Sequence, residues 1–160
     1  MDIRQVTLAD LPDILRIENL GFTADEAGTE AQYRDRIAKL TTTFLVGKIA
    51  DQVVGFVVGP ATTEPLVEDW MYEATPANLV QGGNQLIFTI AVDPAYRGQH
   101  LGSQLLAAMT DLARSQQRET VALTSLARNV PFYEKNGFEN RGVADSDHAG
   151  ETWYNLVKTL

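Results

Sequence analysis

The chain has 160 residues, of which 44% are apolar, a net charge of −8 at pH 7 and no cysteine. This length suits one domain that buries about 70% of the unfolded surface, so a core can form without disulfides. The lack of cysteine excludes disulfides, zinc–thiolate sites and thiol nucleophiles, and the negative charge argues against nonspecific nucleic-acid binding, which needs clustered Lys and Arg. We therefore expect a single domain, residues 1–160, with no metal and no nucleic-acid partner.

The apolar runs are short, and no basic segment precedes one at the start of the chain. We therefore expect neither a signal peptide nor a membrane partner, and a cytoplasmic location.

The first third of the chain predicts a strand, two helices and a hairpin. Ile3 to Val6 is typical of a strand, and a helix with Asp10 as N-cap follows and ends at Gly21. Two sequences of the capping-box type, Thr23-x-x-Glu26 and Thr29-x-x-Gln32, precede a second helix whose apolar face contains Tyr33, Ile37 and Leu40. The runs Phe44–Ile49 and Gln52–Val58 are expected to be strands joined by a turn at Ala50-Asp51.

The rest of the chain alternates a long connection with shorter strands and helices. Residues 61–84 are mixed, with a short helix near 68–73, and connections of this length are usually functional or mobile. This segment could fold over the acceptor as a lid. Its acids could attract an ammonium group or could simply solvate a loop: Glu64, Glu68, Asp69 and Glu73. Next we predict a strand at 86–92, a helix at 101–114, a strand at 120–124, a short helix at 131–136 closed by Gly137, and a final hairpin with Val143 and 152–157.

The most informative segment is the turn between the strand at 86–92 and the helix at 101–114. A strand, a glycine-bearing turn and a helix N-terminus place free backbone N–H groups and the positive end of a helix dipole together. Arg97 adds a fixed positive charge beside them. The segment therefore predicts a site for a diphosphate, although it lacks the Gly-Lys-Ser/Thr ending of a P-loop and the G-x-G-x-x-G of a dinucleotide fold.

Two motifs in sequence resemble those of the GCN5-related N-acetyltransferase (GNAT) superfamily. The first is Arg97-Gly98-Gln99-His100-Leu101-Gly102, and the second is Pro131-Phe132-Tyr133-Glu134-Lys135-Asn136-Gly137-Phe138. The order of predicted elements is also that of the superfamily. The resemblance implies an α/β (α+β) fold with a mixed, mostly antiparallel central sheet of six to seven strands, flanked by about four helices.

The resemblance also implies the roles of particular residues. Acetyl-CoA would be the co-substrate, its pantetheine arm paired with the backbone of Ile90, Ala91 and Val92, and an N–H near Ala91–Val92 would stabilise the oxyanion. Tyr133 would protonate the leaving thiolate. The pyrophosphate would be held by backbone N–H groups of the turn: Arg97, Gly98, Gln99, His100, Leu101, Gly102 and Ser103.

Within the superfamily the chain is most similar to the arylalkylamine N-acetyltransferase branch, on Glu18 to Phe22, Val53 to Gly59, Val130 to Tyr133 and Gly150 to Tyr154. Four positions depart from the family patterns. His100 stands where the signature prefers glycine, and Leu126 stands where the superfamily often has asparagine. Leu86 and Phe88 replace the two strand histidines of the animal enzymes, so that route for deprotonating the amine is absent.

The acceptor side is predicted less sharply. Phe22, Phe88 and Trp153 are candidates for an apolar acceptor pocket, although aromatic residues scattered through a chain are more often core. The general base is open among Glu26, Glu30 and His148, each with an ordinary alternative as a capping, surface or solvated-loop residue.

The expected function is acetyl-CoA-dependent transfer of an acetyl group to the primary amine of a small molecule by direct attack. Alternatives are a protein or peptide N-acetyltransferase and a non-catalytic CoA-binding module. A homodimer through the C-terminal strands is possible in this reading, and no metal site is expected, because two isolated histidines fall short of ligand spacing.

Overall fold

The computed structural model describes every residue from Met1 to Leu160. A four-stranded antiparallel sheet has the order β1-β2-β3-β6. The first third of the chain supplies three of its strands and two helices, and the fourth strand, β6 (Thr89–Val92), comes from later in the chain. The turn at Ala50 and Asp51 has positive φ at both residues, 49° and 68°, as a two-residue hairpin requires. The elements of this part are β1 (Asp2–Gln5), α1 (Leu11–Gly21), α2 (Glu30–Lys39), β2 (Phe44–Ile49) and β3 (Gln52–Val58).

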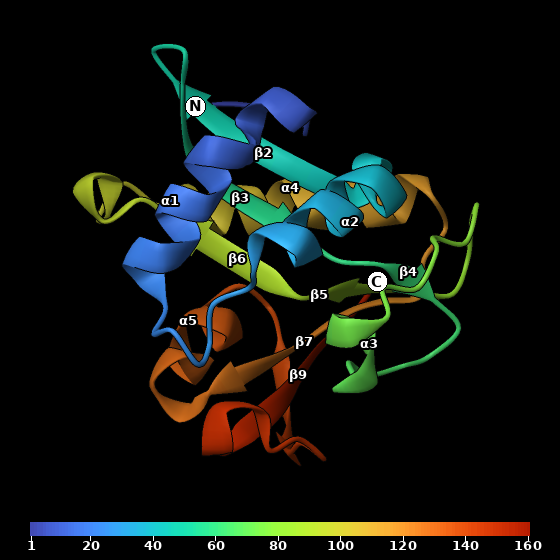
Figure 1. Cartoon of the computed structure of the whole chain (residues 1–160). Helices are drawn as coiled ribbons and strands as arrows, with labels where there is room; N and C mark the ends of the chain where they lie inside the picture. The colour runs from blue at the N-terminus through green and yellow to red at the C-terminus, as the bar shows by residue number, and fades with distance from the viewer.

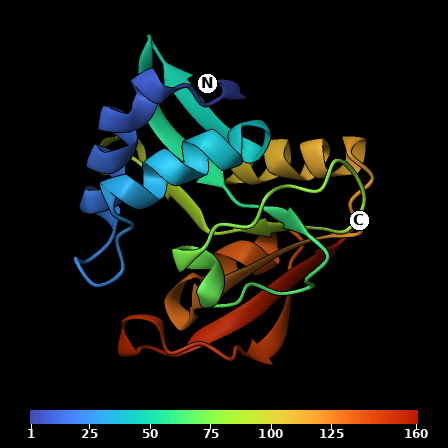
Figure 2. The same ribbon diagram turned by 45° about the vertical axis from the view of Figure 1, so that its right-hand side comes forward.

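Helices cover both faces of this first sheet, with α1 and α2 on one side and α4 (Leu101–Ser115) on the other (Figures 1 and 2). The alternation of buried side chains along β2 explains this arrangement. Phe44 and Val46 pack with residues of α1 and α2, whereas Leu45 packs with Leu105 and other residues of α4. Because both faces are covered, β2 and β3 are apolar almost throughout.

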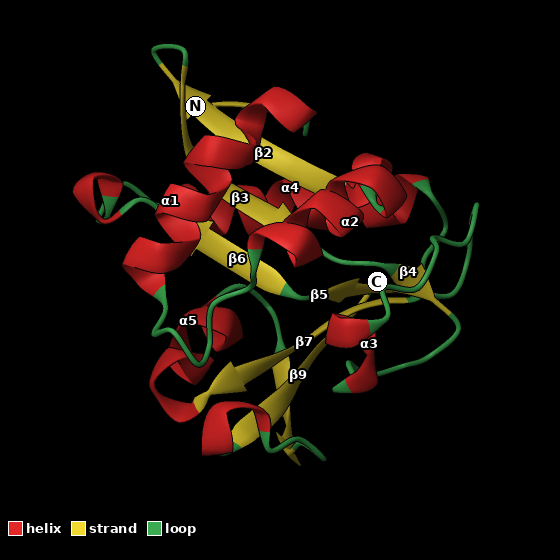
Figure 3. Cartoon of the chain, in the orientation of Figure 1, coloured by secondary structure: helices red, strands yellow, loops and turns green.

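The second half of the chain forms a five-stranded sheet in the order β4-β5-β7-β9-β8, in which only β5 and β7 are parallel (Figure 3). Helix α5 packs against β8 and β9, and α3 packs with Leu86 and Val157 of this sheet. The elements are β4 (Ala61–Thr62), α3 (Trp70–Glu73), β5 (Asn84–Ile87), β6 (Thr89–Val92), β7 (Thr120–Leu126), α5 (Val130–Lys135), β8 (Glu139–Val143) and β9 (Trp153–Thr159).

The predicted strand at 86–92 is wrong as a single element, because it breaks at Phe88. Residues before the break pair with β7, and residues after it pair with β3 in the other sheet. The Phe88 N–H donates to the Val58 carbonyl, although Val58 is already the partner of Thr89, so the chain bulges here. Gly59 makes this approach possible, since a Cβ on it would lie 1.9 Å from the Leu86 carbonyl oxygen. We call this point, Gly59 against Leu86–Phe88, the fork.

The expected mixed, mostly antiparallel architecture is confirmed, with nine strands in two sheets rather than six to seven in one. The extra elements are the short β4 and the division of one predicted strand at the fork. The Thr29–Gln32 capping box forms and opens α2. The Thr23–Glu26 box forms only in part, because Glu26 accepts from the Thr23 N–H and hydroxyl but its own N–H bonds to the Thr23 carbonyl and closes a turn. No helix combines the length and apolar character that crossing a membrane requires.

Candidate functional site

The site lies where the two sheets part. The pairing of β5 with β7 ends at Ile87 and Leu123, and beyond it β6 and β7 each keep a partner only on their outer side. Two adjoining cavities lie there. We call one, of about 650 Å³, the turn cavity and the other, of about 430 Å³, the aromatic cavity. Residues that border both are Ile90, Arg97, Asn129 and Tyr133.

The turn cavity is bordered by the predicted turn and by unpaired backbone donors. None of the N–H groups from Gly98 to Ser103 donates a hydrogen bond to the rest of the chain. Gly98 and His100 have positive φ, 82° and 60°, and this conformation brings the chain into the first turn of α4. Free N–H groups at the start of a 15-residue helix form an anion site by their direction and by the helix dipole.

The approach to this turn is held by Asp93, which is 6% exposed. One of its oxygens accepts from the Ala95 N–H at 3.0 Å, and the other accepts from Arg16 at 2.7 Å. The hydrogen bond from Arg16 is the largest of the effects that lower the pKa of Asp93. A carboxylate that is charged at all physiological pH therefore fixes the start of the turn to α1.

The inner edge of β6 is free. The backbone N–H of Asp93 donates to the Val54 carbonyl of β3. In an antiparallel pair every second residue is hydrogen-bonded to the neighbouring strand, so Ala91 also bonds to β3. The N–H groups of Ile90 and Val92 therefore point away from β3. Ile90, Ala91 and Val92 all border the turn cavity. The two outward N–H groups can accordingly bind an extended amide chain as an added strand would.

Tyr133 lies between the two cavities on α5 and is 9% exposed. Its ring packs edge-on against Phe132, with 5.1 Å between ring centroids, and against Phe138, at 5.9 Å. Burial raises the pKa of Tyr133, because the phenolate would lose its solvation. The hydroxyl is therefore protonated at neutral pH and available as a donor.

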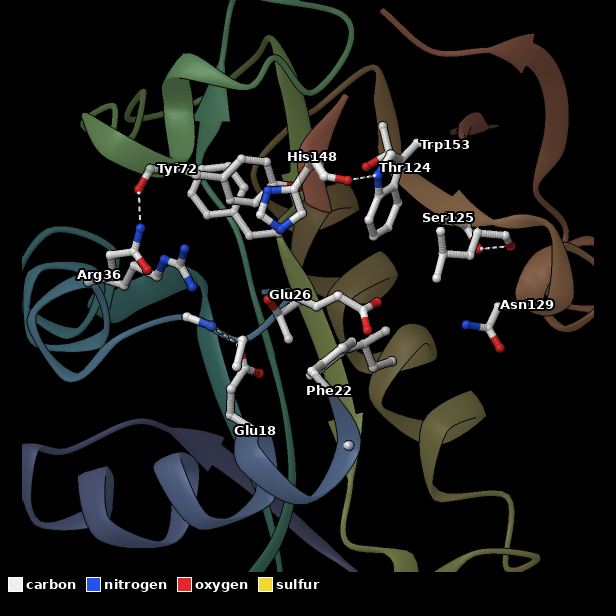
Figure 4. Close-up of a pocket in the computed structure, with 18 of the residues that line it drawn as sticks. Glu18, Phe22, Glu26, Arg36, Tyr72, Thr124, Ser125, Asn129, His148 and Trp153 are labelled. Atoms are coloured by element: carbon white, nitrogen blue, oxygen red, sulfur yellow. Dashed lines mark hydrogen bonds between the residues drawn. The ribbon is translucent and has the colours of Figure 1, made fainter. Parts of the chain in front are cut away.

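The aromatic cavity brings together the three predicted acceptor residues, Phe22, Phe88 and Trp153 (Figure 4). Rings continue along its wall, because Tyr72 lies 4.8 Å from Phe88 and stacks on His148 at 5.5 Å between centroids. His148 in turn lies 5.7 Å from Trp153, whose Nε1 donates to the His148 carbonyl. His148 is thus a packed wall residue and not a solvated loop residue.

Charged side chains face these rings. Glu18 of α1 is 2% exposed, and one of its oxygens accepts from the Gly28 N–H at 2.7 Å. Burial raises the pKa of Glu18, although that hydrogen bond and the nearby Arg36 act in the opposite direction. Glu26 accepts from the Thr23 hydroxyl at 2.9 Å with one oxygen, and Figure 4 shows its carboxylate directed into the cavity.

The structure separates the candidate residues clearly. Of the predicted turn residues, only Gln99 does not border the turn cavity. Among the candidate bases, Glu26 and His148 border the aromatic cavity, whereas Glu30 is exposed and pairs with Arg34 on the surface of α2. The proposed lid contributes Tyr72 and Glu73 to the wall, and its Asp69 accepts a hydrogen bond from Ser146.

Two charged residues that border the aromatic cavity, Arg36 and Glu18, were given no role in the site by the sequence analysis. A usable signal exists for both, because each is a charged residue within the apolar stripe of its helix. Arg36 adjoins Ile37 and follows Tyr33 by three positions, and Glu18 follows Ile14 by four. Asn129 and Tyr72, which also border the cavities, carry no such signal.

Comparison with known proteins identifies the family. The profile described as "Acetyltransferase (GNAT) domain" matches residues 41–140, more than half of the chain, including the fork and the turn. The chain belongs to the GNAT acetyltransferase domain family.

Two curated proteins are related to this GNAT domain. It is 43% identical over 49 residues to glucosamine 6-phosphate N-acetyltransferase of Trypanosoma brucei brucei, covering 31% of this chain and 33% of that protein. It is 27% identical over 143 residues to an uncharacterised protein of Mycobacterium leprae, covering 88% and 35%. The chain thus spans about a third of the length of these curated relatives.

Solved structures agree in fold. The GphF GNAT-like decarboxylase in complex with isobutyryl-CoA is 18% identical, with a TM-score of 0.84 and coverage of 99% of each chain. Naa50 of Arabidopsis thaliana, in complex with the bisubstrate analogue CoA-Ac-MVNAL, is 19% identical with a TM-score of 0.76, covering 99% of this chain and 98% of that one. At these identities the likeness establishes the fold alone.

Proposed function

We propose that this GNAT domain is an acetyl-CoA-dependent N-acetyltransferase that acts on the primary amine of a small molecule. The observation that carries the proposal is the row of unpaired N–H groups from Gly98 to Ser103 in a cavity that adjoins a second one at Tyr133. A diphosphate bound at the first would leave an attached arm free to run along β6 toward Tyr133.

The residues present fit coenzyme A in their chemistry. The turn amides and Arg97 supply donors and positive charge for the pyrophosphate, and the outward N–H of Val92 supplies a donor for an amide of the pantetheine arm. Gly102 keeps the first turn of α4 open, because a Cβ there would lie 3.1 Å from the Phe132 ring. Acetyl-CoA supplies an activated acyl group as a thioester.

Direct transfer requires a neutral amine, an oxyanion donor and a partner for the sulfur. The amine nitrogen bonds to the carbonyl carbon, the carbon–sulfur bond breaks, one proton leaves the amine and one proton ends on sulfur. We assign the oxyanion to the N–H of Ile90, which borders both cavities, and the sulfur to the Tyr133 hydroxyl. Because burial raises the pKa of Tyr133, its contribution is chiefly a hydrogen bond to the developing thiolate.

A small acceptor is favoured over a peptide because ring residues from three separate segments line the acceptor cavity. Phe22 follows α1, Phe88 lies at the fork and Trp153 begins β9, and all three border the same 430 Å³ space. A space of this volume accommodates a small molecule. The aromatic wall also agrees with the narrower resemblance to the arylalkylamine branch, although the amine specificity of that branch is not carried over to this chain.

The test has two stages. Calorimetric titration with acetyl-CoA should give one site per chain, and release of free thiol should then be measured over amines, polyamines, amino acids and short peptides. Acetylated product from small amines supports the proposal. Binding without product from any acceptor would leave a CoA-binding module, and product from peptides alone would make the acceptor a polypeptide.

A further inference from the structure

Arg36 is a buried cation with no partner in the protein. It is 2% exposed, its Nε has no hydrogen-bond partner, and no carboxylate lies within ion-pair distance of its guanidinium. The guanidinium lies over the rings of Tyr33 at 4.8 Å, Phe88 at 5.1 Å and Tyr72 at 6.0 Å from the centroids. An arginine side chain stays protonated in proteins, so this end of the aromatic cavity carries a full positive charge.

The rings do not account for the burial of this charge. Cation–π contacts are worth about 2 kcal/mol when desolvated, whereas burying an unpaired ion costs several kcal/mol. Glu18 lies near Arg36 and interacts with its charge, but the two side chains form no ion pair, and both lie beside Gly28. A Cβ built on Gly28 would lie 3.2 Å from Arg36 Nη1 and 3.3 Å from Glu18 Oε2. Arg36 is therefore placed to pair with an anionic group that enters the cavity.

Unsatisfied acceptors lie in the same cavity. Oε1 of Glu18 and Oε2 of Glu26 are both buried without a hydrogen-bond partner, although the other oxygen of each is held by the chain. Figure 4 shows Glu18 and Glu26 on one side of the cavity, the rings of His148 and Trp153 on the other, and Arg36 near Tyr72. The remaining charged groups that border the cavity are Glu73, Arg97 and Arg128. Acids and cations are thus equal in number, and one oxygen of each of Glu18 and Glu26 and the Nε of Arg36 have no hydrogen-bond partner in the protein.

We propose that the acceptor is a small aminocarboxylate, a molecule of the amino-acid type, with its carboxylate on Arg36 and its amine toward Glu18 and Glu26. This rests on the proposed function and narrows its substrate class. A plain amine would leave Arg36 unpaired, and a plain carboxylate would leave the two glutamate oxygens unpaired, whereas a zwitterion satisfies both. The aromatic wall then contacts the side chain of the acceptor, and a glutamate beside the amine can accept the proton that it loses.

The experiment compares amino acids with their own decarboxylated amines, for example phenylalanine with phenethylamine and alanine with ethylamine. In the unmodified protein kcat/KM for the amino acid should exceed that for the amine by about tenfold or more, the value of a charge-assisted hydrogen bond. Arg36→Met, which keeps an apolar side chain under the rings, should lower that preference by about tenfold through KM and so abolish it. Arg36→Lys should restore part of it. Arg34→Met, an exposed position on the same helix, is the matched control and should leave the preference unchanged.

Equal or better use of the decarboxylated amine would overturn the inference, as would an equal loss for both acceptors in Arg36→Met. Faster acetylation of a peptide that begins with aspartate than of free aspartate would assign the carboxylate to a polypeptide and overturn it too. Calorimetric binding of the amino acids to protein saturated with CoA gives a readout without turnover. Binding there without any acetyl transfer would refute the proposed function alone, and no binding by any amino acid would refute this inference. Thermal unfolding and acetyl-CoA affinity establish that each variant is folded.

Discussion

The two cavities that meet at Tyr133 are built in different ways. The turn cavity is made mostly of backbone: N–H groups of one continuous segment, Gly98 to Ser103, and the free edge of β6. The aromatic cavity is made of side chains from α1, α2, α3, β7 and the segment 148–153. A backbone site tolerates many side chains, whereas a side-chain site changes with each substitution. The first is therefore suited to the co-substrate that a family shares, and the second to an acceptor that differs between members.

Tyr133 borders both cavities, and removing its hydroxyl is expected to have the largest effect on activity. Tyr133→Phe keeps the buried ring and removes the donor, so kcat should fall about 10³-fold while the affinity for acetyl-CoA stays unchanged. Because burial raises its pKa, Tyr133 should stay protonated from about pH 6 to 9 and cause no alkaline loss of activity there. Tyr154→Phe, at a position that borders neither cavity, is the control. Unchanged turnover in Tyr133→Phe would show that the Tyr133 hydroxyl does not assist the leaving thiolate.

The fork that separates the cavities depends on Gly59. In Gly59→Ala the new Cβ would lie 1.9 Å from the Leu86 carbonyl oxygen, so the backbone must move, and we expect a loss of about 3 kcal/mol in the free energy of unfolding. Urea unfolding measures it. Gly21→Ala, where no atom lies within 4 Å of the new Cβ, should be neutral or stabilising by about 0.5 kcal/mol. Similar values for both variants would mean that the close approach is not needed.

Arg97 borders both cavities, and the effect of removing its charge shows which cavity holds the phosphate groups. If it contacts phosphate, Arg97→Met should weaken acetyl-CoA binding about tenfold at low salt, and the difference should shrink as salt is added. Arg128→Met, which borders only the aromatic cavity, should change acetyl-CoA binding less. Titration calorimetry at two salt concentrations measures both. A larger effect of Arg128→Met would reverse the assignment of the cavities.

The buried Glu18, which borders the aromatic cavity, makes the stability of the fold depend on pH. Burial raises the pKa of Glu18 in the folded state, so its contribution to stability is full below the ordinary value near 4.3 and is lost as pH rises through the raised pKa. Glu18→Gln cannot ionise and can still accept from Gly28. Its stability relative to wild type should therefore increase between about pH 4 and 7 by on the order of 1 kcal/mol in urea unfolding. The exposed Glu30→Gln should show no such trend.

The smallest effect is expected at His100, the one side chain that departs from the family pattern in the turn. Its φ of 60° is unfavourable for any residue but glycine, so His100→Gly should stabilise the fold by about 0.5 kcal/mol. Since its N–H remains, acetyl-CoA affinity should be kept or improved. Weaker binding in calorimetry would mean that the imidazole itself contacts the co-substrate.

The contrast between a cavity built from one continuous segment and a cavity built from distant side chains also explains what could be predicted from the sequence. The hairpin at Ala50-Asp51, the helix after His100 and the phosphate turn are local, because neighbours in sequence supply all their parts. The break at Phe88 could not be predicted, since it depends on Gly59 and Val58, nearly thirty residues earlier. Phe22, Phe88 and Trp153, named from the sequence as candidates for one pocket, do border one cavity, and their role toward an acceptor stays a prediction. The charges of Glu18 and Arg36 become meaningful only when α1 and α2 are seen to border the same space.

The free inner edge of β6 has one more consequence. An exposed strand edge invites pairing with any other chain, and proteins usually block it with charge, proline or a covering loop. Here the edge lies in a cavity that is also bordered by Phe132, Tyr133 and Lys135 of α5. The protection is therefore geometric, because a β-strand of another protein carries side chains on both faces and needs more room beside β6 than a narrow ligand does.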